Sequence, residues 1–128
     1  MKKKKILIID DEQIILDVAS VILEHLGFES VKALNGNKAL EIYKKYKNEI
    51  ILAMIDINMT ILDGKETCLK LREINDNLPV IFTSGNKYDG IHFLKEFDSV
   101  EFVNKPFVLL ELKQKLLKLL KLQNINDI

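Results

Sequence analysis

The sequence is poor in cysteine and has no excess of charge of either sign. Its 128 residues include one cysteine, Cys68, which excludes an internal disulfide and a zinc site built from several cysteines. Lys and Arg number 19, as do Asp and Glu, so no strong global field favours nucleic acid or a membrane as a partner. Apolar runs are too short to span a bilayer, and no signal peptide is evident. These absences predict a cytoplasmic protein.

Length and composition predict one globular domain. Hydrophobic residues make up 48% of the chain and charged residues 30%, a balance typical of folded proteins. The length suffices for one core but not for two ordinary domains, and the sequence has no repeat or linker. We expect a domain over residues 1–122 and a frayed tail over 123–128.

Short apolar runs alternate with helical patterns along the chain. The predicted strands are 6–9, 28–33, 50–55, 80–83 and 101–103. Apolar residues at helical spacing predict helices over 14–26, around 40–43, and over 64–74, 91–97 and 108–122. Strict alternation of this kind predicts an α/β fold with a parallel sheet covered by helices on both faces.

Polar residues follow four of the five predicted strands: Asp10 and Asp11, Asp56, Ser84, and Lys105. Open parallel sheets bind ligands at this edge. If the first and third strands are neighbours, the three carboxylates converge, which is unfavourable without a cation among them. Carboxylate oxygens suit Mg²⁺. The alternatives are that Asp11 only caps a helix and that Asp56 only ends a strand.

Lys105 extends this interpretation from metal binding to phosphoryl chemistry. Beside the carboxylates it could form a simple salt bridge. With a divalent ion and the Ser84 hydroxyl, it would also form a cradle for a phosphoryl group that a carboxylate attacks. The Lys105-Pro106 bond invites a cis peptide that aims the lysine inward. Ser84 could otherwise merely finish its strand.

These residues, in this order, resemble the receiver domain of two-component response regulators, the module that includes the single-domain chemotaxis regulator. The resemblance runs from about Lys5 to Leu122. It is carried by Asp10-Asp11-Glu12, Asp56, Asp63-Gly64, Pro79 to Gly85, and Lys105-Pro106-Phe107. It implies a flavodoxin-like, doubly wound sheet of five parallel strands in the order 2-1-3-4-5 with five helices. It also implies a signalling module rather than an enzyme with an external substrate.

The resemblance implies a role for each site residue. Asp56 would be the phosphoacceptor, assisted by Lys105 and Ser84. The ligands of the Mg²⁺ or Mn²⁺ ion would be Asp11, Asp56, the backbone carbonyl of Asn58 and, through water, Asp10. Ser84 and Phe102 would form the switch, and the side chains of Asn58 and Asn86 would tune dephosphorylation.

The resemblance also implies partners. The donor would be a sensor histidine kinase or a phosphotransfer protein. The output would be a downstream protein or a phosphorylation-dependent homodimer, bound through the fourth helix, fifth strand and fifth helix. On the last helix, Leu109, Leu112, Leu116 and Leu119 are expected in the core. An apolar patch with a basic rim is expected from Leu110, Leu117, Leu120, Lys113, Lys115, Lys118 and Lys121, the alternative being that these three leucines all belong to the core.

The sequence departs from the family pattern at several places. Thr60 stands where proline is usual, Phe102 stands where tyrosine is common, and the stretch between Ser84 and Lys105 is short. These departures concern switching and remove no catalytic group.

Three alternatives remain. A degenerate receiver would act only as a binding module. A haloacid dehalogenase-like phosphatase is suggested by residues 56–60, although Asn58 stands where that signature needs an acid. A flavodoxin-type flavin carrier is disfavoured because Asp10-Asp11-Glu12 would repel a phosphate.

Overall fold

The computed structural model describes residues 4–86 and 89–121, without the side chains of residues 91–93. Its five strands are β1 (Lys5–Ile9), β2 (Glu29–Ala33), β3 (Ile50–Asp56), β4 (Val80–Ser84) and β5 (Val100–Asn104). They form one parallel sheet in the order β2-β1-β3-β4-β5, which confirms the predicted fold class. The expected tail, 123–128, lies outside the described residues.

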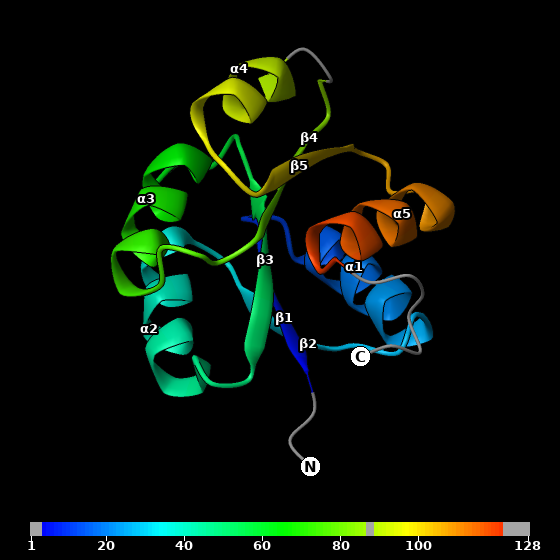
Figure 1. Ribbon diagram of the computed structural model, residues 1–128, viewed down its shortest axis with the longest axis horizontal. Helices are drawn as coiled ribbons and strands as arrows, with labels where there is room; N and C mark the ends of the chain where they lie inside the picture. The colour runs from blue at the N-terminus through cyan, green and yellow to red at the C-terminus, as the bar shows by residue number, and fades with distance from the viewer. Residues whose placement is uncertain (1–3, 87–88, 122–128) are drawn as a thin grey trace.

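Five helices cover the sheet. They are α1 (Gln13–His25), α2 (Gly36–Tyr46), α3 (Gly64–Ile74), α4 (Asp89–Glu96) and α5 (Leu109–Leu119). Figure 1 shows α1 and α5 on one side of the sheet and α2 and α3 on the other. The side chains of Asn35 and Asp63 cap α2 and α3, each accepting a backbone N–H at 2.8 Å. Helix α5 ends at Leu119, earlier than the expected Leu122, and Lys121 then adopts a φ of 56°.

The sheet divides the apolar interior into two cores. Successive strand residues point to opposite faces, so Ile6 and Ile8 pack with α1 and α5, whereas Leu7 and Ile9 pack with α2 and α3. This explains why β1 is apolar at four consecutive positions. Leu112 and Leu116 of α5 are fully buried as expected, but Leu109 is 42% exposed. The prediction that Leu109 lies in the core is therefore wrong.

The strand register brings the predicted site residues to one edge of the sheet. Ile9 is paired with Ile55, Asp56 with Thr83, and Ser84 with Asn104. The residues that end β3 and β4, and those that follow β1 and β5, therefore meet at the carboxyl edge. None of the helices in 4–86 and 89–121 has the length and hydrophobicity needed to cross a membrane.

Candidate functional site

Three carboxylates meet at the carboxyl edge of the sheet. One oxygen from each of Asp10, Asp11 and Asp56 lies within 4.8 Å of the others. Asp10 and Asp56 are only 1% and 4% exposed, whereas Asp11 is exposed. Buried carboxylates this close repel one another unless cations compensate them. The convergence inferred from the strand order is thus present in the structure.

Asp11 does not cap α1. The N-cap position is Glu12, and no side chain caps it. The Asp10 carboxylate instead accepts the Glu12 N–H at 2.9 Å, which fixes Asp10 in the turn after β1. Asp11 makes no hydrogen bond or ion pair with the described residues. The capping alternative is therefore wrong, and the Asp11 carboxylate is free to bind a cation.

Lys105 supplies the positive charge within the cluster. Its Nζ lies 2.6 Å from Asp10 Oδ2 and 3.4 Å from Asp56 Oδ1. The Lys105 N–H donates to the Ser84 carbonyl at 2.8 Å, and the Lys105-Pro106 peptide is cis, as predicted. Burial of the ammonium works to lower the pKa of Lys105, but the contacts with Asp10 and Asp56 outweigh it and raise that pKa. Lys105 therefore remains a cation beside both carboxylates.

The environment of Asp56 disfavours its charge. Burial, followed by the neighbouring Asp10 charge, raises the pKa of Asp56 to about 6, although Lys105 and the Asn58 N–H act against the rise. That N–H lies 3.3 Å from Asp56 Oδ1. At neutral pH the carboxylate is mostly ionised but poorly compensated. A further cation would relieve this cost.

The donor set fits a divalent ion. Three carboxylates are hard oxygen ligands, and Mg²⁺ usually takes one or two carboxylates together with several waters. Asp11 and Asp56 would hold such an ion, with Asp10 already committed to Lys105 and the Glu12 N–H. Participation of the Asn58 carbonyl remains a prediction.

Gly64 explains how the loop after Asp56 closes on the site. A Cβ at Gly64 would lie 2.5 Å from the backbone oxygen of Asp56, so only glycine permits this approach. The Gly64 N–H donates to the Ile57 carbonyl at 3.1 Å. The Asp63-Gly64 pair thus both begins α3 and fixes the loop beside Asp56.

Ser84 contacts a residue that sequence reasoning missed. Its hydroxyl donates to Asp89 Oδ2 at 2.8 Å, and the Asn58 side-chain amide donates to the same oxygen at 3.3 Å. An acidic residue in the first turn of a helix is common, because it interacts favourably with the helix dipole. Asp89 therefore gave no sequence signal of its own. The helix also begins two residues before the predicted position 91.

The surface formed by α4, β5 and α5, which was expected to bind partners, differs in part from the prediction. Phe102 is half-buried and packs against the core and over Gly90, where any Cβ would collide with its ring. Leu110 is 62% exposed, but Leu120 packs partly against the core. Lys115 and Lys118 both pair with Glu101, at 3.0 and 3.2 Å, which neutralises part of the basic rim.

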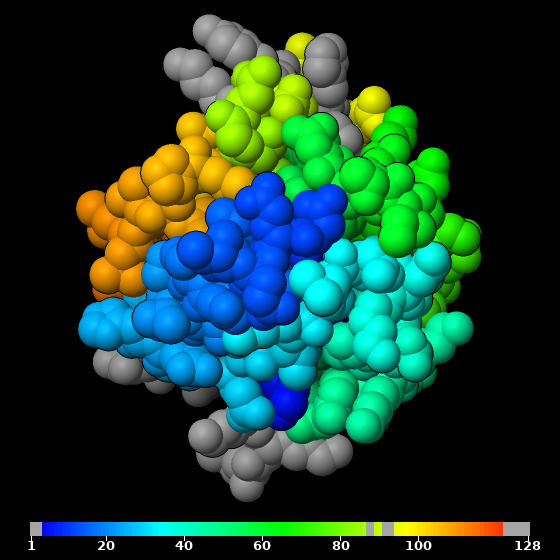
Figure 2. Space-filling view, turned by 180° about the vertical axis from the view of Figure 1, so that it is seen from behind, coloured from blue at the N-terminus to red at the C-terminus, as the bar shows by residue number. Residues whose placement is uncertain are grey.

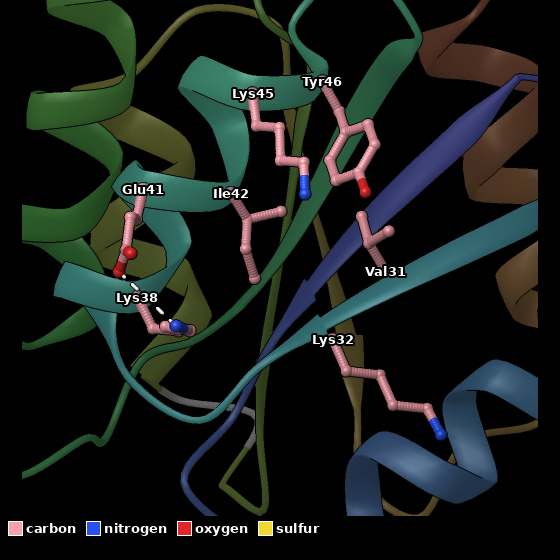
Figure 3. A pocket seen from close by; sticks show the side chains of 7 residues that line it. All are labelled: Val31, Lys32, Lys38, Glu41, Ile42, Lys45 and Tyr46. Carbon is pink, nitrogen blue, oxygen red and sulfur yellow. Dashed lines mark ion pairs between the residues drawn. The ribbon is translucent and has the colours of Figure 1, made fainter.

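A hollow lies between β2 and α2 (Figure 3). It is lined by Val31, Lys32, Lys38, Glu41, Ile42, Lys45 and Tyr46. Its lysines already have partners, because Lys38 pairs with Glu41, Lys32 pairs with Asp17, and Lys45 lies over the Tyr46 ring. It shares no residue with the carboxyl edge, so it is not part of the candidate site.

Comparisons with known proteins agree with this geometry. The family model "Response regulator receiver domain" matches residues 6–117. Sporulation initiation phosphotransferase F of Bacillus subtilis (strain 168) is 30% identical over 125 residues, covering 97% of this chain and 99% of that protein. The probable transcriptional regulator ycf27 of Cyanophora paradoxa is 36% identical over 124 residues, covering 94% of this chain. The chain spans about half the length of that regulator and of its similarly named relatives.

A solved structure extends the similarity to the whole fold. The response regulator receiver domain protein from Clostridium thermocellum matches with a TM-score of 0.83 and 27% sequence identity. The alignment covers 92% of this chain and 94% of that one.

Proposed function

The chain belongs to the response regulator receiver family of two-component signalling, whose domains are signalling modules, and from this premise we propose that Asp56 accepts a phosphoryl group in a divalent-ion-dependent reaction. The observation that supports this most strongly is the convergence of the Asp10, Asp11 and Asp56 carboxylates, with the Lys105 ammonium paired to Asp10 and Asp56. We assign the phosphoacceptor unit to residues 1–122.

The proposed reaction transfers a phosphoryl group from a phosphohistidine. An Asp56 oxygen attacks phosphorus, an O–P bond forms as the N–P bond breaks, and the departing imidazole keeps the electron pair. A bound Mg²⁺ or Mn²⁺ would neutralise charge on the phosphoryl oxygens. Lys105 contributes a second positive charge beside Asp56, and Ser84 offers a hydroxyl donor.

The donor must bring its phosphohistidine to Asp56, so it must dock on the surface that surrounds the site. Two apolar groups are exposed on α1 and at the start of α5, which adjoin in the view of Figure 2, and each group begins three residues after a residue of the site, Asp11 or Lys105. They are Ile14, Val18 and Val21, and Val108, Leu109 and Leu110. Exposed apolar residues beside a reactive centre favour a protein donor. We propose a sensor histidine kinase or a phosphotransfer protein, acting in the cytoplasm.

Asp11→Ala should weaken Mg²⁺ binding by at least about tenfold, since even changes outside the ligand set commonly cost that much. Isothermal titration calorimetry measures this directly. Glu12→Ala, which removes the same charge from the adjacent exposed residue, should bind nearly as wild type. Equal Mg²⁺ affinity in Asp11→Ala and wild type would contradict the assignment of Asp11 as a ligand.

Asn58 and Asn86 are proposed to set the lifetime of the phosphoryl group. Neutral amides can orient a water molecule but are poor general bases. We expect Asn58→Ala and Asn86→Ala each to alter the dephosphorylation rate severalfold while Mg²⁺ affinity stays nearly constant. Decay of the phosphoprotein can be followed by intact-mass measurement. Unchanged decay in the double variant would exclude this role.

The output is proposed to be a protein contact through α4, β5 and α5. Phosphorylation adds roughly 1.5 to 2 negative charges and three acceptor oxygens, which can draw the Ser84 hydroxyl toward them. Phe102, packed over Gly90, would respond to that movement. Leu110 then remains for a downstream target or a second copy of the chain, together with Lys113 and Lys121, which form no ion pair with the residues that the structure describes.

The function is tested by incubating the chain with acetyl phosphate and Mg²⁺ and measuring its intact mass. One phosphoryl group should appear, should require the divalent ion, and should be removed by hydroxylamine, which cleaves acyl phosphates. Absence of any adduct would favour the degenerate receiver. Turnover of an added phosphate ester would favour the phosphatase alternative.

A further inference from the structure

A carboxylate outside the acidic cluster holds the Ser84 hydroxyl. Asp89 Oδ2 accepts from Ser84 Oγ at 2.8 Å and from Asn58 Nδ2 at 3.3 Å. Asn58 Nδ2 also lies 3.4 Å from Ser84 Oγ, to which the Asn86 N–H donates at 3.1 Å. Ser84 is buried and Asp89 half-buried. This network joins the first turn of α4 to the end of β4 and to the loop after β3.

The Ser84 hydroxyl has only one proton to donate. In this structure the acceptor is Asp89, whose charge strengthens the bond. A phosphoryl group on Asp56 would need the same proton. The two acceptors therefore compete.

We propose, building on the proposed function, that Asp89 is a positioning residue that opposes switching by retaining the Ser84 hydroxyl on α4. A phosphoryl group on Asp56 has to displace Asp89 before Ser84 can bind it. The stability of the Ser84–Asp89 bond then sets how strongly the chain resists activation.

The same bond connects the site to the output face. Gly90 follows Asp89 directly and lies against the Phe102 ring with no room for a Cβ. At the other end of α4, Glu96 pairs with Lys65 of α3 at 2.8 Å. Loss of the Asp89 bond would free the first turn of α4 while its last turn stays held. Movement at Ser84 would thereby change the packing between α4 and Phe102.

Asp89→Asn tests the proposal because it keeps the shape of the side chain and removes its charge. Beryllofluoride with Mg²⁺, used as a mimic of the phosphoryl group, should bind about 5- to 10-fold more tightly to Asp89→Asn. That range is the difference between a hydrogen bond to a charged acceptor and one to a neutral acceptor. Affinity for Mg²⁺ alone should not change. Asp98→Asn, an equal charge change at an exposed position before β5, is the matched control and should bind the mimic as wild type does.

A second measurement needs no mimic. The Asn86 N–H donates to Ser84 Oγ, so its NMR amide resonance reports the position of the hydroxyl. In Asp89→Asn without the mimic, this resonance should move toward its position in the mimic-bound wild type. Asp89→Ala should move it in the same direction, and Asp98→Asn should not move it.

The Ser84→Ala background separates the hydrogen bond from charge repulsion alone. In the Ser84→Ala background, Asp89→Asn should no longer improve binding of the mimic, because the hydroxyl for which Asp89 and the mimic compete is absent. An undiminished improvement in this background would overturn the proposal, as would unchanged mimic affinity and an unchanged Asn86 resonance in Asp89→Asn. Failure of the wild type itself to bind the mimic would instead contradict the proposed function.

Discussion

Replacing Asp56 by Asn is expected to abolish phosphorylation and, in the same protein, to increase stability above pH 6. An amide cannot take the place of the carboxylate as nucleophile, so intact-mass measurement after treatment with acetyl phosphate and Mg²⁺ should find no adduct. Asp98→Asn, the surface control, should accept one phosphoryl group like the wild type. A normal adduct on Asp56→Asn would place the acceptor elsewhere.

The stability gain follows from the raised pKa of Asp56, which is about 6 in the folded protein against an ordinary 3.8. Well below pH 3.8 the carboxyl group is protonated in both the folded and the unfolded chain and contributes nothing to stability. Between pH 4 and 6 the unfolded chain loses this proton before the folded chain does, so the wild type loses stability as pH rises. Above pH 6 the ionised Asp56 lowers the free energy of unfolding of the wild type by a constant amount, about 1 to 3 kcal/mol.

Urea unfolding without divalent ions measures this cost. The free energy of unfolding of Asp56→Asn should exceed that of the wild type by about 1 to 3 kcal/mol at pH 8, and the difference should shrink steadily as the pH falls through 6 toward 4. Residues of functional sites commonly lower the stability of the folded protein. A difference that does not depend on pH would show that the charge of Asp56 is not its source.

Lys105→Met should have the opposite effect on stability and a large effect on the reaction. It removes the cation that Asp10 and Asp56 share, and both of these carboxylates are buried. Removing one partner of a buried ion pair typically costs about 3 to 5 kcal/mol. We expect a loss of that size at pH 8 without divalent ions, and a smaller loss when Mg²⁺ is added or when the pH falls and Asp56 is protonated.

The reaction should separate from metal binding in this variant. The initial rate of phosphoryl incorporation should fall by about 100-fold, because one preorganised positive charge is lost. Mg²⁺ affinity should be unchanged or higher, because a cation has left the site. Lys44→Met, at an exposed position on α2, is the control for both measurements. Loss of Mg²⁺ binding together with the reaction would assign Lys105 a structural role instead.

The fold could be predicted because its pattern is local and repeated. Each apolar run of strand length is followed by a periodic helix, and this alternation admits few topologies. The site could also be predicted, because the carboxyl ends of parallel strands lie at the same edge of a sheet. Polar residues that directly follow such strands are therefore brought together. Asp10, Asp56 and Lys105 lie there together.

The contacts that could not be predicted join residues of different helices, strands and loops, so they depend on how these elements pack. Asn58 and Asp89 are 31 residues apart and meet because the start of α4 lies beside Ser84. Lys115 and Lys118 both pair with Glu101 of β5. The helical spacing of α5 predicts where the two lysines lie on the helix, but it does not predict which residue of the neighbouring strand they contact. Leu109 has the spacing of a core residue, yet at the first turn of α5 it remains 42% exposed.

The most direct test of the central claim is to locate the phosphoryl group within the chain. Borohydride reduces an aspartyl phosphate to homoserine and leaves free carboxylates intact, so peptide mass spectrometry can identify the modified residue after reaction with acetyl phosphate and Mg²⁺. We predict homoserine at position 56 and nowhere else, formed only when the divalent ion is present. Reduction at Asp10 or Asp11 instead, or a stable phosphate on a hydroxyl side chain, would contradict the assignment of Asp56 as the phosphoacceptor.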